Sequence, residues 1–76
     1  MCGIVGYIGT KKASNVILKG LKRLEYRGYD SAGISTIENK KIKTSKCEGK
    51  ISDLENLPTI NDHENSIGIG HTRWAT

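Results

Sequence analysis

Apolar residues recur along the chain with two different periods, one typical of strands and one typical of helices. The short apolar run Cys2–Ile8 is rich in β-forming residues and predicts a buried strand. Over Ala13–Glu25 the apolar side chains recur at helical spacing, which predicts an amphipathic helix. Gly28 is placed to end that helix.

A hairpin is predicted next. The segment Asp30–Ile37 alternates, with Ala32 and Ile34 on one face and small residues on the other. Glu38–Asn39 has the composition of a turn. Lys41–Cys47 is therefore expected to return as the partner strand.

The last third of the chain predicts a short helix and a final strand. Ser52 and Glu55 have the spacing of a capping box, and the helix that it opens runs through Leu57 until Pro58 terminates it. Residues 59–65 are polar and predict a loop, whereas residues 66–74 alternate and predict a strand. The element order is thus β-α-β-β-α-β, a mixed α and β chain.

The length limits what these elements can form. With 76 residues, the chain holds one domain at most. It ends in a predicted strand with no following helix, so apolar surface on one face of the sheet would stay uncovered. We therefore expect these residues to be the beginning of a longer protein.

The charge of the chain is moderately positive, with 12 Lys and Arg against 8 Asp and Glu. The lysine-rich stretch 40–50 lacks the interleaved aromatic side chains that stack on bases, so no nucleic-acid partner is expected. No apolar run reaches the roughly 18 residues of a membrane span, and the first residues do not resemble a secretory signal. We expect no membrane partner and a reducing, cytoplasmic location.

Cys2 is the most informative candidate for a reactive residue. Methionine aminopeptidases remove Met1 when the second side chain is small, and this would leave Cys2 with a thiol and a free α-amine. Thiols have a reference pKa of about 8.5 and α-amines one of about 7.7–8.0, so such an amine can accept the thiol proton near neutral pH. The alternative is a small apolar residue that simply begins a strand.

Two arginines are candidates for holding an anionic group. Arg73 could grip a carboxylate with both arms of its guanidinium, while Trp74 and Thr76 complete a polar pocket. The alternative is a surface arginine stacked on Trp74. Arg27 has the same two interpretations, either an internal ion pair with Asp30 or an orienting group for a site.

Neither a metal nor a cofactor is expected. Cys2, Cys47, His63 and His71 lack the short spacings that build zinc sites, and no phosphate-binding glycine loop occurs. Cys47 is interpreted as a spectator on the hairpin and His63 as a solvated loop residue. His71 alternates with two isoleucines, so we interpret it as a hydrogen-bonded core histidine.

Three motifs together resemble the start of the class II glutamine amidotransferases: MCGIVGYIG at the N-terminus, LEYRGYDSAG at 24–33 and GHTRWAT at 70–76. The first four letters alone are shared with asparagine synthetase, glutamate synthase and the purine-pathway phosphoribosyl amidotransferase. The two longer motifs resemble the hexosamine-forming branch of the family. The likeness covers the whole chain in order and spacing, with the variable part at roughly 38–65.

The resemblance implies an α+β fold, the αββα sandwich of the N-terminal nucleophile (Ntn) hydrolases, of which residues 1–76 are the N-terminal part of a glutaminase domain. It assigns Cys2 the role of nucleophile and Arg73 the role of binding the α-carboxylate of glutamine. Trp74 and Thr76 match positions that line the glutamine pocket, and Arg27 matches an orienting residue near the nucleophile.

The implied reaction is glutamine hydrolysis through a cysteine thioester, with ammonia delivered to fructose 6-phosphate to make glucosamine 6-phosphate. In the family, an Asn-Gly oxyanion hole, an aspartate for the glutamine amine and the sugar-phosphate region all follow later in the sequence. Activity is therefore expected of the complete enzyme, as a homo-oligomer. The alternatives are another class II amidotransferase or a non-catalytic remnant that binds glutamine or a partner.

Overall fold

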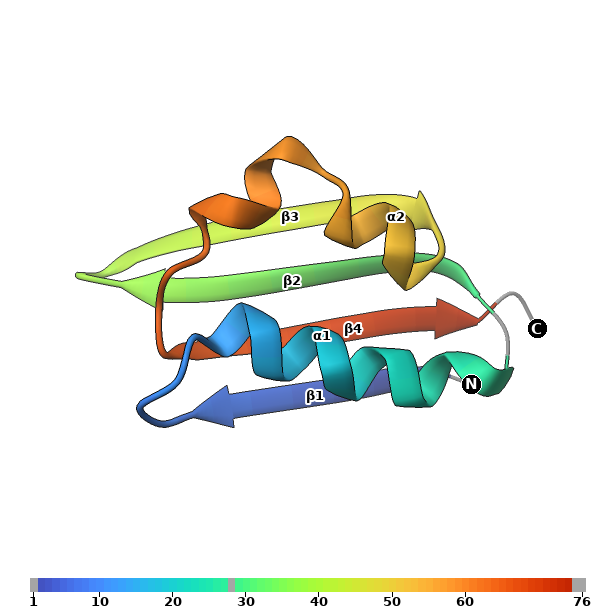
Figure 1. Cartoon of the computed structure of the whole chain (residues 1–76), viewed down its shortest axis with the longest axis horizontal. Coiled ribbons are helices and arrows are strands. Elements are labelled where there is room, and N and C mark those ends of the chain that lie inside the picture. Colours follow the sequence, from blue (N-terminus) through green and yellow to red (C-terminus); the bar gives the residue numbers. More distant parts are fainter. Residues whose placement is uncertain (1, 28, 75–76) are drawn as a thin grey trace.

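The elements follow the predicted order β-α-β-β-α-β, with two short 3₁₀ turns added (Figure 1). The structure is a computed structural model that describes residues 2–27 and 29–74. Its elements are β1 (Gly3–Ile8), α1 (Ala13–Leu24), η1 (Glu25–Arg27), β2 (Asp30–Glu38), β3 (Lys41–Gly49), α2 (Ile51–Glu55), η2 (Pro58–Asp62) and β4 (Ile67–Trp74). Helix α1 passes directly into η1, and Gly28, its predicted stop, lies outside the described residues.

One antiparallel sheet contains all four strands, in the order β1-β4-β2-β3. The helices lie on a single face of it, α1 over β1 and β4 and α2 beside β3 (Figure 1). We call this the helix face and the opposite side the open face. No helix among residues 2–27 and 29–74 is long and apolar enough to cross a membrane.

The core lies between the sheet and the helices. Ile17 and Leu21 of α1 pack against the strands, and Ile51 and Leu54 of α2 extend the same cluster. Ile34 meets them from the centre of the sheet. All five side chains are at most 1% exposed, so α1 and α2 share one core rather than covering separate parts of the sheet.

The hairpin turn lies one residue later than predicted. Glu38 pairs with Lys41, which leaves Asn39 and Lys40 as a two-residue loop. Their φ angles are 49° and 66°, the pair of positive values that a type I′ turn requires. This turn type matches the twist of the flanking strands, and Asn tolerates the left-handed region better than most residues.

The predicted capping box on Ser52 is wrong, because the N-cap of helix α2 is Lys50, two residues earlier, and the helix begins at Ile51. The backbone N–H of Lys50 donates to Asp53 Oδ2 at 2.8 Å, so Asp53 fills the role predicted for Glu55. The N–H of Ile51 donates to Glu25 Oε2 at 2.6 Å, which ties α2 to the end of the first helical segment. Pro58 does not end a helix but begins the 3₁₀ turn η2.

Strand β4 presents the opposite face to the core from the one predicted. Its small residues Gly68, Gly70 and Thr72 are buried beneath α1, whereas Ile69 and His71 point to the open face and are exposed. The prediction that His71 is a core histidine is therefore wrong. The prediction assumed that the more apolar residues of the strand face the core. The glycines face it instead, because they leave room for α1, and the bulky residues lie on the other face.

The interpretation of His63 as solvated is also wrong, because its side chain is only 1% exposed. Its Nδ1 lies 2.8 Å from Thr36 Oγ1 and its Nε2 lies 2.8 Å from Ser45 Oγ, so the ring bridges β2 and β3. Asn65 Nδ2 donates to Thr36 Oγ1 at 2.9 Å, and Ser45 Oγ lies 2.9 Å from Thr59 Oγ1. We call these five side chains the His63 network.

One proton arrangement gives each of the four hydrogen bonds in the His63 network one donor and one acceptor. Thr36 accepts from Asn65 and donates to Nδ1 of a neutral His63, whose Nε2–H donates to Ser45. Ser45 then donates to Thr59. A charged imidazolium would need two acceptors and would break this order. Burial lowers the pKa of His63, and the nearby Lys43 lowers it further.

The loop that carries His63 also holds the start of α1. Ser14 Oγ donates to the His63 carbonyl at 3.1 Å, and the Ala13 N–H donates to the Asn65 carbonyl at 2.8 Å. No side chain caps this helix, so the Asn65 carbonyl satisfies one of its free N–H groups instead. The loop thus links both strands of the hairpin to the first turn of α1.

The lowered pKa of His63 predicts a loss of stability in acid. Above its ordinary pKa of 6.5 both states hold a neutral ring, whereas below it the unfolded chain binds a proton that the folded protein excludes. The free energy of unfolding should therefore fall as the pH drops from 6.5 towards the folded-state pKa. Urea unfolding at pH 7.5, 6.5 and 5.5 measures this.

The matched variant for that experiment is His63→Gln, which keeps hydrogen-bonding capacity but cannot titrate. It should be less stable than the native protein at pH 7.5, and its stability should change less between pH 7.5 and 5.5. Parallel pH profiles for the two proteins would contradict the assignment of a neutral, buried ring.

The contact of α1 with β4 predicts a strong effect of one added methyl group. A Cβ at Gly70 would overlap the side chain of Ile17 and lie 3.0 Å from Leu21 Cδ1. Gly70→Ala should lower the free energy of unfolding by about 1–3 kcal/mol, the usual cost of overpacking. The control is Gly6→Ala on the open face, where the nearest atom lies 3.9 Å away. Its effect should stay within about 0.5 kcal/mol, and equal effects in urea unfolding would contradict this packing.

Candidate active site

Cys2 lies directly before β1, and its side chain is exposed. Strands β1 and β4 pair with Gly3 opposite Thr72. Continuing this antiparallel register by one residue places Cys2 opposite Arg73. Neighbouring strands in a sheet are about 4.8 Å apart, so Cys2 and Arg73, which lie near opposite ends of the described sequence, become neighbours.

Arg73 lies on the open face, near the end of β4 and opposite Ser31 of β2. Its Nη1 is 3.4 Å from Asp30 Oδ2, and the two side chains are 65% and 40% exposed. The guanidinium is therefore oriented by an ion pair while its remaining N–H groups stay open to solvent. Asp30, which the sequence offered as one possible partner for Arg27, contacts Arg73 in the structure. The predicted pair with Arg27 involves a side chain outside the described parts.

The remaining predicted site residues are Trp74, Arg27 and Thr76, and Trp74 is the one whose side chain the structure describes. Trp74 is the last residue of β4, is half-buried and lies opposite Asp30 in the register. The backbone of Arg27 belongs to η1, but its side chain is not among the described parts. Thr76 lies outside the described residues. Cys2, Arg73 and Trp74 thus share one end of the sheet, and the places of the other two side chains remain predictions.

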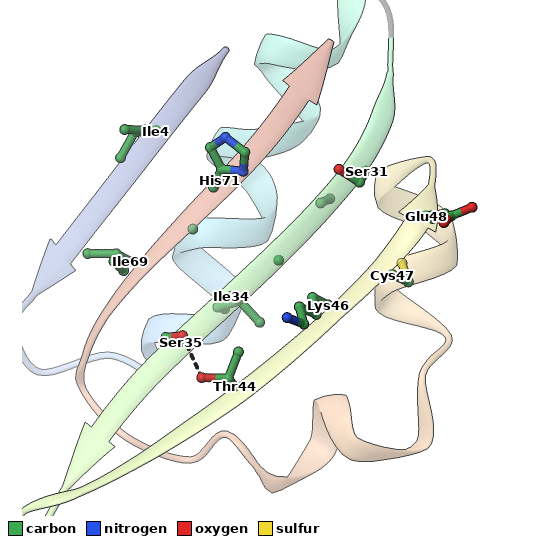
Figure 2. Close-up of a pocket in the computed structure, with 13 residues that line it drawn as sticks. Ile4, Ser31, Ile34, Ser35, Thr44, Lys46, Cys47, Glu48, Ile69 and His71 are labelled. Atoms are coloured by element: carbon green, nitrogen blue, oxygen red, sulfur yellow. Dashed lines mark hydrogen bonds between the residues drawn. The ribbon is translucent and has the colours of Figure 1, made fainter. Parts of the chain in front are cut away.

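A shallow groove of about 470 Å³ runs over the open face next to this end of the sheet (Figure 2). Ile4 and Ile69 line one side of it, and His71 stands between β1 and β2. On the opposite side of the groove, the hydroxyl oxygens of Ser35 on β2 and Thr44 on β3 are 2.8 Å apart. The groove is therefore mostly apolar, and the paired hydroxyls of Ser35 and Thr44 form a polar spot on its β2–β3 side.

Cys47 differs from Cys2 in its surroundings. It is half-buried on the helix face, opposite Ala32, and packs against the core. Burial raises the pKa of its thiol, and the nearby charge of Asp53 raises it further. A thiol of this kind stays protonated and unreactive at neutral pH, in keeping with its interpretation as a spectator. Cys2 is the exposed one of the two thiols.

The structure separates the four residues that might have suggested a metal site. His63 is buried on the helix face, His71 lies on the open face, and the two cysteines are at different strands. Among residues 2–27 and 29–74, no three His, Cys, Asp or Glu side chains gather in a way that could hold a metal ion.

The ion pair that sequence reasoning missed is the one between Asp30 and Arg73. The position of Asp30 in the motif YRGYDSAG marked it as an ion-pair candidate, but the nearest arginine in the sequence was Arg27. Arg73 becomes its partner only because β2 and β4 are neighbours, with Asp30 opposite Trp74. No local pattern in the sequence carries that pairing.

Comparisons with solved structures give the class of the fold. No family model matches the chain. One similar structure is the allosteric regulatory enzyme of purine biosynthesis, with a TM-score of 0.87 and 28% identity over 100% of this chain and 16% of that one. Another is the glutamine phosphoribosylpyrophosphate amidotransferase of B. subtilis, with a TM-score of 0.86 and 27% identity over 99% of this chain and 16% of that one. The fold is therefore the N-terminal part of an Ntn hydrolase amidotransferase.

Sequence relatives are more specific. The chain is 57% identical to a glutamine–fructose-6-phosphate aminotransferase of Clostridium perfringens, 58% to one of Bacteroides thetaiotaomicron and 60% to one of Pyrococcus horikoshii. Each match covers 100% of this chain but only 12–13% of the relative. The chain belongs to the class II glutamine amidotransferases. Within that family it is similar to the N-terminal region of the glutamine–fructose-6-phosphate aminotransferases.

Proposed function

We propose that this chain is the N-terminal part of the glutaminase domain of a glutamine–fructose-6-phosphate aminotransferase. The complete enzyme hydrolyses glutamine through a thioester on Cys2 and delivers the ammonia to fructose 6-phosphate, giving glucosamine 6-phosphate. The observation that carries the proposal is the register of β1 and β4, because it sets an exposed thiol at the chain terminus opposite an exposed arginine.

The proposed mechanism needs no histidine. After removal of Met1, the α-amine of Cys2 takes the thiol proton, directly or through a water, as Sγ attacks the side-chain amide carbon of glutamine. The tetrahedral intermediate collapses to a glutamyl thioester, and the amide nitrogen leaves as ammonia with that proton. Water then cleaves the thioester to glutamate and restores the thiol. Stabilisation of the oxyanion falls to donors that the family places later in the sequence.

The exclusion of histidine is supported by where the two rings lie. His63 is buried within its own hydrogen-bond network on the helix face, so it cannot reach a group on the open face. His71 is exposed in the groove, on the same face as Arg73 and two residues before it on β4, but it lies opposite Ile4 of β1 rather than Cys2. A base that belongs to Cys2 itself requires neither ring.

In the proposed binding mode, Arg73 takes the α-carboxylate of glutamine. Its guanidinium is solvent-accessible on the face where Cys2 lies, and charge-assisted contacts of this kind orient a substrate as well as binding it. Trp74, Thr76 and Arg27 keep the roles that the family motifs imply: the first two line the pocket, and Arg27 orients the nucleophile.

The sequence relatives favour this acceptor over that of another class II amidotransferase. Identity is 57–60% to the three fructose-6-phosphate enzymes reported above but 27–28% to the two purine-pathway structures, although the fold matches those structures. A cytoplasmic location is part of the proposal because a nucleophilic thiol must stay reduced. Assembly of the complete enzyme as a homo-oligomer is proposed on the family resemblance alone.

The proposal predicts selective alkylation of Cys2. A glutamine-like electrophile such as 6-diazo-5-oxonorleucine should label Cys2 of the complete enzyme, with Met1 absent, and should abolish glutamate release. The internal control is Cys47, whose pKa is raised by burial and which should stay unlabelled. Peptide mass spectrometry reads out both. Labelling of Cys47 with Cys2 untouched, or a retained Met1 in the active protein, would refute the mechanism.

The proposal also predicts a defined defect for Arg73→Ala in the complete enzyme. The KM for glutamine should rise roughly ten- to a hundredfold, the usual loss on removing a charge-assisted contact. Synthesis driven by added ammonium salts should change little, because ammonia does not use this contact. Steady-state glutamate release measures the first and product formation the second. Unchanged glutamine kinetics would leave Arg73 with a structural role only.

A further inference from the structure

We propose that Asp30 is a positioning residue for glutamine, holding the guanidinium of Arg73 in the orientation that receives the α-carboxylate. This inference rests on the proposed function. The motif assignments gave Asp30 no role in the site. The observation behind it is the ion pair between Asp30 Oδ2 and Arg73 Nη1 at 3.4 Å, which joins the start of β2 to the end of β4.

The geometry leaves the substrate side of Arg73 open. A guanidinium carries five N–H donors in a planar fork, and the described ion pair engages Nη1. The Arg73 side chain is 65% exposed, so its other donors remain accessible on the open face. A second carboxylate can then bind the same guanidinium without displacing the first.

The strand register explains why this orientation needs support. Arg73 lies one residue from the end of β4, and only the short side chain of Ser31 stands directly opposite it on β2. A long side chain with such a neighbour has many rotamers and would lose them on binding a substrate. The carboxylate of Asp30, opposite Trp74, restricts that freedom before the substrate arrives.

A competing role for Asp30 would be to occupy Arg73 until glutamine displaces it. The separation argues against this, because 3.4 Å is longer than the roughly 2.7–2.9 Å of a strong charge-assisted contact. The 40% exposure of Asp30 also allows water to screen the pair. Asp30 thus directs the guanidinium more than it blocks it. The two roles have opposite consequences for the KM for glutamine.

The test compares Asp30→Asn, Asp30→Glu and Glu64→Gln in the complete enzyme. Asp30→Asn should raise the KM for glutamine about fivefold or more, a coupling typical of interacting side chains, with kcat within about twofold. Asp30→Glu, which keeps the charge, should recover most of that loss. Glu64 is an exposed acid in the loop before β4 and outside the site, so Glu64→Gln should leave the KM unchanged.

A double-mutant cycle separates positioning from a structural effect. In an Arg73→Ala background, Asp30→Asn should change the KM no further, since its effect acts through Arg73. A KM that is unchanged in the single variant, or that falls, overturns the inference; so does a further rise in the Arg73→Ala background. If Asp30→Asn does not fold, judged by circular dichroism, Asp30→Ser takes its place in the cycle.

The outcomes for the two proposals are distinguishable. If the unmodified complete enzyme releases no glutamate from glutamine, or Cys2→Ala still does, the proposed function is wrong. If the unmodified enzyme is active through Cys2 and the Asp30 variants retain its KM, only the positioning role of Asp30 is wrong.

Discussion

The antiparallel pairing of β1 with β4 is the constraint on which the candidate site depends. It joins a strand that begins at Gly3 to one that ends at Trp74, so it closes a loop of almost the whole chain. Closing so long a loop costs conformational entropy that strand pairing alone does not offset. Helix α1 contributes the remaining stabilisation, because it lies over both strands and packs on the glycines of β4.

This arrangement connects packing on the helix face to chemistry on the open face. Ile17 and Leu21 enter the space that Gly70 leaves free, and this close contact holds β4 in its place between β1 and β2. The position of β4 in turn brings Arg73 beside both Cys2 and Asp30. A change far from the thiol, beneath α1, would therefore move Arg73 relative to Cys2 and Asp30.

The two faces of the sheet differ in how far their side chains are buried. The helix face has a closed apolar core and the His63 network, which hydrogen-bonds side chains of two strands to a loop. The open face exposes six isoleucines: Ile4, Ile8, Ile37, Ile42, Ile67 and Ile69. Strands that are apolar on both faces belong to sheets covered on both sides, which agrees with the Ntn hydrolase sandwich identified by the comparisons.

Periodicity predicted the elements well because each segment has a clear repeat. Ala13, Ile17 and Leu21 recur at helical spacing and are fully buried in α1, and Ala32 and Ile34 lie on the same buried face of β2, as expected. The family motifs likewise led to the fold and class that the comparisons support.

What the sequence could not provide was the choice of face and the pairing of distant residues. Ile69 is more apolar than Gly70, yet Gly70 faces the core because α1 needs its space. His63 lies in a polar loop, yet its ring is buried because Thr36 and Ser45 hydrogen-bond its two nitrogens. Asn65 and Thr59 in turn hydrogen-bond those two hydroxyls, and all of these contacts form only when β2, β3 and the loop come together.

In the proposed function, the Asp30–Arg73 pair prepares an arginine for the carboxylate of glutamine. An exposed ion pair contributes only about 0.2–1 kcal/mol to folding, so its main consequence here is geometric. The family resemblance assigns the ammonium group of glutamine to an aspartate later in the sequence, so Asp30 is not needed to balance that charge. The role proposed for Asp30 is to limit the rotamers of Arg73 before the carboxylate arrives, which lowers the entropy lost on binding. The carboxylate then meets a guanidinium whose direction is already set by the pairing of β2 with β4.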